Sequence, residues 1–123
     1  MKICLYSVND FPVVQELSAM LARGCDQADL IRLAEDFAFN RISEQIRSGD
    51  IIILVLASRT EIEHFLEMKE ILADFRLVIL LADNSEEMAT LAHGLMPRFL
   101  ATVDQEIDAI IHVIERMVRQ SAH

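Results

Sequence analysis

The feature that most constrains the fold of this chain is an uninterrupted aliphatic run from Ile51 to Leu56, in which four of the six residues are β-branched. A strand with one face in solvent alternates apolar and polar residues, and this run does not alternate. We therefore predict a strand that is covered on both faces, as in a parallel sheet between two layers of helices. Gly49-Asp50 precedes the run and Ser58-Arg59-Thr60 follows it, which makes it the candidate central strand.

Four further strand-like segments alternate with helix-like segments along the chain. The additional strands are expected over residues 2–8, 29–34, 76–82 and 98–103. Strands that alternate with helices across short connections predict a three-layer, doubly wound α/β fold with a five-stranded parallel sheet. The segment 29–34 is less apolar than the others and is expected near an edge, which favours the flavodoxin-like strand order 2-1-3-4-5.

The helices are predicted from apolar residues three and four positions apart and from residues that favour helix ends. Thr60 with Glu63, and Asn84 with Glu87, predict capping boxes at the starts of the third and fourth helices. All three glycines fall at predicted helix ends. The predicted buried positions are Val14, Leu17 and Leu21 in the first helix, Phe39, Ile42 and Ile46 in the second, Ile62, Phe65, Leu66, Leu72 and Phe75 in the third, Met88, Leu91, Ala92 and Leu95 in the fourth, and Ile107, Ile110, Ile111, Ile114 and Met117 or Val118 in the last.

Size and composition restrict the class of protein. The 123 residues are expected to form a single domain spanning 1–123. A net charge of −9, from 11 basic and 20 acidic side chains, repels phosphate backbones, so we expect no nucleic-acid partner. No apolar run approaches the roughly 18 residues of a membrane span, and no signal-peptide pattern precedes Asn9. The sequence therefore predicts a cytoplasmic protein with no membrane partner.

The candidate site residues follow the predicted strands, because ligands of doubly wound folds bind beyond the carboxyl ends of the strands. Asp10, Asp83 and Asp104 could approach one another there, although the favoured interpretation is that each caps or precedes the helix that follows it. No glycine-rich phosphate loop follows the first strand, and no G-x-S-x-G elbow is present. The four histidines, and Cys4 and Cys25, show no metal-ligand spacing. We accordingly expect two free thiols, no metal and no cofactor.

Across roughly residues 2–119, the order and length of the elements resemble the receiver domain of two-component response regulators. The most specific similarity lies in Leu81-Ala82-Asp83-Asn84-Ser85-Glu86-Glu87, continuing through Ala92-His93-Gly94 to Arg98-Phe99-Leu100. Gly49-Asp50-Ile51-Ile52-Ile53-Leu54 similarly resembles the family's approach to its phosphorylation site. The resemblance implies a flavodoxin-like fold and a place in bacterial signal transduction.

The functional residues of that family are missing at the matching positions. The phosphoacceptor aspartate falls on Val55, and the magnesium-binding acidic pair falls on Ser7 and Val8, or on Asn9 and Asp10 if the loop is displaced. The threonine or serine that closes on the phosphoryl group falls on Ala82, and the lysine of the fifth strand falls on Thr102. Phosphoryl transfer to aspartate needs a carboxylate, a held divalent cation and a fixed positive charge. The resemblance therefore implies a degenerate pseudo-receiver that is not an enzyme.

Three functional hypotheses follow. The preferred one is a non-phosphorylatable signalling module that acts through protein contacts, with a homodimer as one possible partner arrangement. The second is a phosphoacceptor receiver with a displaced acidic site at Asp10 and Asp83, and the third is a small-ligand-binding flavodoxin-like domain. The family's usual contact surface would here contain His93, Arg98, Phe99, His112 and Arg116, although these could also be ordinary surface residues.

Overall fold

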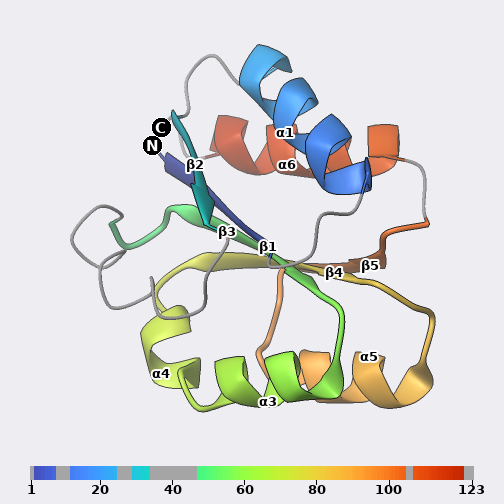
Figure 1. Ribbon diagram of the computed structural model, residues 1–123. Helices are drawn as coiled ribbons and strands as arrows, with labels where there is room; N and C mark the ends of the chain where they lie inside the picture. The colour runs from blue at the N-terminus through green and yellow to red at the C-terminus, as the bar shows by residue number, and fades with distance from the viewer. Residues whose placement is uncertain (1, 8–11, 25–28, 34–46, 105–106, 121–123) are drawn as a thin grey trace.

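The protein forms a five-stranded, all-parallel sheet between two layers of helices (Figure 1). The computed structural model describes residues 2–7, 12–24, 29–33, 47–104 and 107–120. The strands are β1 (Lys2–Ser7), β2 (Asp29–Leu33), β3 (Ile51–Leu56), β4 (Arg76–Leu81) and β5 (Phe99–Thr102). Their order is β2-β1-β3-β4-β5, which confirms the predicted flavodoxin-like topology.

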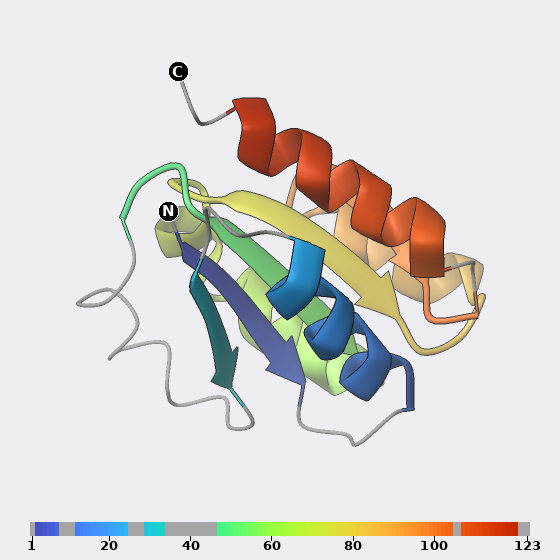
Figure 2. The same ribbon diagram turned by 90° about the horizontal axis from the view of Figure 1, so that it is seen from above.

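Five described helices cover the two faces of the sheet. Helices α1 (Pro12–Gly24) and α6 (Ile107–Gln120) lie side by side on one face, as Figures 1 and 2 show. Helices α3 (Arg59–Leu66), α4 (Lys69–Leu72) and α5 (Glu86–His93) lie on the other face. The predicted second helix, marked by Phe39, Ile42 and Ile46, falls outside the described residues.

Strand β3 occupies the centre of the sheet and is buried along its whole length, as the aliphatic run predicts. Its residues alternate between two apolar cores. Ile51, Ile53 and Val55 pack in the core under α1 and α6, whereas Ile52, Leu54 and Leu56 pack in the core under α3 and α5. Both sides of this strand are therefore interior, which explains why its sequence shows no polar alternation.

The start of α3 differs from the prediction. Ser58, rather than Thr60, is the N-cap: its backbone is extended (φ −143°, ψ 158°) and its Oγ accepts a hydrogen bond from the Glu61 N–H at 3.3 Å. Glu63, the predicted partner of Thr60, instead pairs with Arg59 at 2.7 Å. The predicted capping box is therefore wrong by two residues, because the helix begins sooner after β3 than expected.

The predicted third helix is also interrupted. The Met68 N–H donates to the Phe65 carbonyl at 3.0 Å, and Met68 leaves helical geometry (φ −102°, ψ 17°), so α3 ends at Leu66 and α4 begins at Lys69. The predicted apolar face is nevertheless buried at Ile62, Phe65 and Leu72.

Helix α5 begins one residue later than predicted. The N-cap is Ser85, whose Oγ accepts from the Met88 N–H at 3.3 Å, and not Asn84. Met88, Ala92 and Leu95 are buried, as predicted.

Polar side chains hold the amino ends of the strands together. The Arg76 Nε donates to the Gly49 carbonyl at 2.8 Å, and its Nη1 donates to the Met117 carbonyl at 2.5 Å. Asp50 accepts hydrogen bonds from the backbone N–H groups of Lys2 and Arg47, at 3.3 Å and 2.9 Å. These contacts tie β1, β3, β4 and α6 together at the end of the sheet opposite the predicted site.

Cys4 lies inside the sheet and is a free thiol. Burial raises the pKa of the Cys4 thiol to about 12, so the thiol stays protonated at neutral pH and is a poor nucleophile or metal ligand. Cys25 falls outside the described residues.

Candidate functional site

Four predicted pocket positions lie together at the carboxyl ends of neighbouring strands. Ser7 pairs with Val55 across β1 and β3, and Leu81 pairs with Thr102 across β4 and β5. The Ala82 N–H donates to the Leu56 carbonyl at 2.9 Å, which holds the end of β4 against the end of β3. We call Ser7, Val55, Ala82 and Thr102 the rim. The remaining predicted position, Val8, falls outside the described residues.

Val55, where the resemblance places the phosphoacceptor, has an exposed fraction of 0%. It belongs to the apolar core under α1 and α6, together with Leu5, Leu80 and Ala101. A valine side chain has neither an oxygen nucleophile nor a charge. At this position near the end of β3 the chain therefore presents only an apolar side chain, packed against other apolar side chains.

The described carboxylates beyond the strand ends form local hydrogen bonds. Asp83 Oδ1 accepts from the Ser85 N–H at 3.0 Å, and Asp104 Oδ1 accepts from the Thr102 hydroxyl. Both aspartates are exposed. Such short-range contacts are typical of turns and helix starts. Asp10 falls outside the described residues, so the structure does not test the predicted Asp10–Asp83 pair.

Within the described ranges, no three His, Cys, Asp or Glu side chains are grouped so that they could hold a metal ion. A pocket of about 230 Å³ opens beside the rim, between β4, β5 and the start of α5. Leu81, Leu100, Asp83 and Thr102 are among the residues that line it, and none of its lining residues is basic or aromatic. The pocket therefore offers no cation to neutralise a phosphoryl group and no ring on which a flavin or base could stack.

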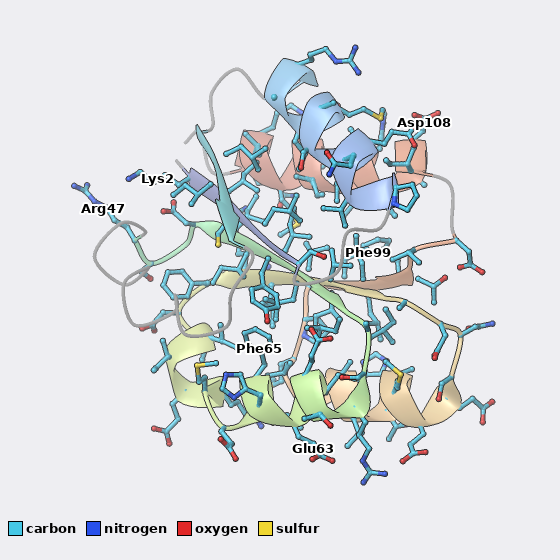
Figure 3. The ribbon with its side chains drawn as sticks, in the orientation of Figure 1. Lys2, Arg47, Glu63, Phe65, Phe99 and Asp108 are labelled. Carbon is cyan, nitrogen blue, oxygen red and sulfur yellow. The ribbon has the colours of Figure 1, made fainter. Side chains whose placement is uncertain are left out.

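The predicted contact face is only partly assembled. Arg98 and Arg116 are exposed and line the same pocket of about 200 Å³. His112 is exposed one turn before Arg116 on α6, whereas His93 is exposed at the end of α5, in the opposite helical layer. Phe99 is partly buried and packs on the α1–α6 side of the sheet, as Figure 3 shows. Arg98 and Arg116 are thus the predicted contact residues that the structure brings together.

Sequence reasoning missed a second pocket of about 250 Å³ that adjoins Arg98 on its other side. Lys69 of α4 and Met96, in the turn before β5, help to line it. These residues are 27 positions apart in sequence and belong to no shared motif, so only the folded chain brings them together.

The described helices include none that is both long enough and apolar enough to cross a membrane.

No protein-family model matches this sequence, and no curated protein matches it. Several solved structures are similar to this protein. A Burkholderia pseudomallei protein provisionally named as pilus assembly-related is 15% identical, with a TM-score of 0.71 over 100% of this chain and 92% of the other. An atypical orphan response regulator, described with a phosphorylation-independent regulatory mechanism, is 17% identical, with a TM-score of 0.66 over 97% and 96% of the two chains.

A third similar structure is RcsB from Salmonella enterica serovar Typhimurium, bound to the rprA promoter in the presence of phosphomimetic BeF₃⁻. It is 10% identical, with a TM-score of 0.73, and the match covers 94% of this chain and 67% of RcsB. Because RcsB is seen with DNA, the comparisons do not support the expected exclusion of nucleic acid. At these identities the similarity establishes the fold alone: the chain has the fold of response-regulator receiver domains.

Proposed function

We propose that this protein is a receiver-like signalling module that is not phosphorylated, has no enzymatic activity and acts through contacts with other proteins. The observation that carries the proposal is the complete burial of Val55 in apolar packing, at the position where the resemblance places the phosphoacceptor. A receiver that lacks this carboxylate can still present its surfaces to a partner, because the fold does not depend on the phosphorylation chemistry.

The other described rim residues support the same proposal. Aspartyl phosphorylation needs a divalent cation that neutralises the developing charge and a fixed cation near the product. Ser7, Ala82 and Thr102 carry no charge, and the nearby carboxylates of Asp83 and Asp104 accept local hydrogen bonds. Phosphorylation-independent regulation is described for the atypical orphan regulator of the same fold, which gives the proposal a structural precedent.

We expect the amide NMR spectrum to remain unchanged when beryllofluoride and Mg²⁺ are added together. Beryllofluoride mimics the phosphoryl group by binding an aspartate carboxylate with the help of the metal, and β3 ends without that carboxylate. The measurement compares the amide shifts of Ser7, Val55, Ala82 and Thr102 with Mg²⁺ alone and with Mg²⁺ plus beryllofluoride. A saturable shift at these residues that requires both components would refute the proposal and favour the displaced acidic site.

A further inference from the structure

The pocket of about 250 Å³ lies at the amino ends of the strands, the end of the sheet opposite the rim (Figure 1). Its walls come from α4 and the residues that follow it, from the start of β4 and from the turn before β5. It includes Arg98 but no residue of β5 or α6. We call it the α4 pocket.

The inner wall of the α4 pocket is apolar. Leu72, Leu77 and Leu95 line it, and their exposed fractions are 2%, 2% and 5%. Phe75 also lines it and packs against the core under α3 and α5. A ligand with an apolar body would displace water from these side chains, and the hydrophobic effect would stabilise it there.

The volume of the pocket limits the size of such a ligand. An apolar cavity of about 150 Å³ holds one benzene molecule. The α4 pocket, at about 250 Å³, therefore has room for one ring, or a hydrocarbon chain of similar size, with a short substituent. Drug-sized ligands and cofactors occupy clefts of about 300–1,000 Å³ and are too large for it.

Two cationic side chains line the same pocket. Lys69 from α4 and Arg98 from the turn before β5 are both exposed. Glu70 and Asp74 are close to Lys69 in sequence but do not line the pocket, and no other carboxylate of the described residues lines it. Of the ion pairs within 4.0 Å that join described residues, none involves Lys69 or Arg98. Both cations can therefore pair with the anionic group of a ligand.

Arg76 adds a third positive charge close to Arg98. Partial burial lowers the pKa of Arg76, and the positive charge of Arg98 lowers it further, while Asp50 opposes the shift. The Arg76 guanidinium donates to the carbonyls of Gly49 and Met117, so its charge is held in place by the backbone. The potential around Arg98 is therefore positive even though Asp50 is near Arg76.

The acidic net charge of the protein acts differently from these local charges. A net charge of −9 repels every anion at long range. At physiological ionic strength, however, the Debye length is only about 8 Å, so an anion inside the pocket interacts mainly with the charges beside it. Those charges are Lys69 and Arg98, and they favour an anionic ligand over a cation with the same apolar body.

Met96 forms part of the outer wall of the pocket. Its side chain is 77% exposed, and its φ of 55° is a left-handed conformation that non-glycine residues seldom adopt. The Met96 N–H donates to the His93 carbonyl at 3.0 Å, and the Arg98 N–H donates to the Leu77 carbonyl at 2.7 Å, which fixes this turn. Strained positions concentrate at functional sites, and a flexible thioether side chain can adapt to an apolar ligand.

We propose that the α4 pocket binds a small carboxylic acid, in its anionic form, with an apolar body about the size of one benzene ring. The body would pack against Leu72, Leu77 and Leu95, and the carboxylate would pair with Lys69 and Arg98. The pocket lies away from the rim, so this inference goes beyond the proposed function and does not depend on it. Such a site would give a signalling module that is not phosphorylated a chemical input of its own.

The test is an amide NMR titration of the full chain with phenylacetate, cyclohexanecarboxylate and hexanoate. We expect at least one of these acids to give saturable shifts at Ala73, Leu95 and Met96, with a Kd of about 1 mM or lower, which is attainable for a ligand of about ten non-hydrogen atoms. The uncharged primary amide of the same acid should bind at least about tenfold more weakly, because it lacks the charge. Acetate, which lacks the apolar body, should give no saturable shift.

A pair of double variants separates the local charge from the net charge. Lys69→Gln/Arg98→Gln removes both cations of the pocket, so it should weaken binding of the acid by about tenfold or more and leave binding of the amide unchanged. Arg23→Gln/Arg119→Gln removes two exposed arginines from α1 and α6, on the other face of the sheet from α4. It changes the net charge by the same amount and should leave both affinities unchanged.

A third variant fills the pocket. Ala73 lines it and is exposed, so the ring of Ala73→Phe can occupy the pocket without displacing the core. This variant should lose acid binding and keep the urea midpoint of the unaltered protein. The unchanged midpoint shows that the loss of binding does not come from unfolding.

Several results would overturn the inference. These are the absence of saturable shifts with all three acids up to about 10 mM, equal affinities for an acid and its amide, unchanged acid binding by Lys69→Gln/Arg98→Gln, and acid binding that a folded Ala73→Phe variant retains. Saturable shifts confined to the rim would place the ligand elsewhere. Self-association that Ala73→Phe abolishes would assign the pocket to a second copy of the chain and overturn the inference too.

Discussion

Val55→Asp is expected to lower the free energy of unfolding by about 3–5 kcal/mol, because it places a charge without a cationic partner in an apolar core. Val55 is fully buried, and its core neighbours include Leu5, Leu80 and Ala101. A domain of this kind has a total stability of about 5–15 kcal/mol, so the variant should be marginally folded. Urea unfolding followed by circular dichroism measures the difference.

Val55→Asn is the matched control for the Val55→Asp prediction, since it is polar and of the same shape but does not ionise. Desolvation raises the pKa of a buried aspartate above its unfolded value of about 3.9, so the folded state of Val55→Asp should be least penalised at low pH. Its deficit relative to the unaltered protein should therefore shrink as the pH falls from about 8 to about 4, while that of Val55→Asn stays constant. An unchanged midpoint for Val55→Asp, with added stability in Mg²⁺, would mean that the rim still binds metal.

Phe65→Ala is expected to cost about 3–5 kcal/mol on the opposite face of the sheet, because it removes a large buried ring and leaves a cavity. Phe65 is 0% exposed and points from α3 toward the sheet, as Figure 3 shows. Its ring meets that of Tyr6 edge-on, with centroids 4.9 Å apart and an interplanar angle of 81°. Edge-to-face pairs of this kind add to the free energy gained by burial alone.

Ile71→Ala is the control for Phe65→Ala. Ile71 is 48% exposed on the short helix α4, so its truncation should change the unfolding free energy by less than about 1 kcal/mol. Equal losses for the two variants, measured by urea unfolding under the same conditions, would contradict the assignment of Phe65 to the core under α3 and α5.

The fold could be predicted because each element carries its own periodic pattern. The residues of β3 do not alternate between apolar and polar, which predicted burial of both faces of the strand, and the strand is buried throughout. The apolar positions Ile110, Ile111 and Ile114 of α6 are also buried, as predicted. Helix starts were harder to predict, since Ser58 and Thr60 are both good N-cap residues separated by one position. Which of them caps α3 depends on how soon the chain turns after β3, and local spacing does not encode that.

The two candidate sites differ in how far the sequence revealed them. The rim positions Ser7, Val55, Ala82 and Thr102 come from the resemblance to receiver domains, which could be applied once the strands had been identified from their sequence patterns. The two pockets that Arg98 lines combine residues from α4, the turn before β5 and α6, and Met96 beside one of them has a left-handed backbone. Neither this long-range juxtaposition nor a positive φ at a methionine has a sequence signature.

We propose that this protein keeps the receiver fold without the phosphorylation chemistry. The most direct test is the intact mass of the protein after incubation with acetyl phosphate and Mg²⁺, beside a phosphorylatable receiver as positive control. We expect the mass of this protein to stay unchanged while the control gains one phosphoryl group. A single magnesium-dependent phosphoryl adduct on an aspartate of this chain, at Asp10 or Asp83 for example, would contradict the claim.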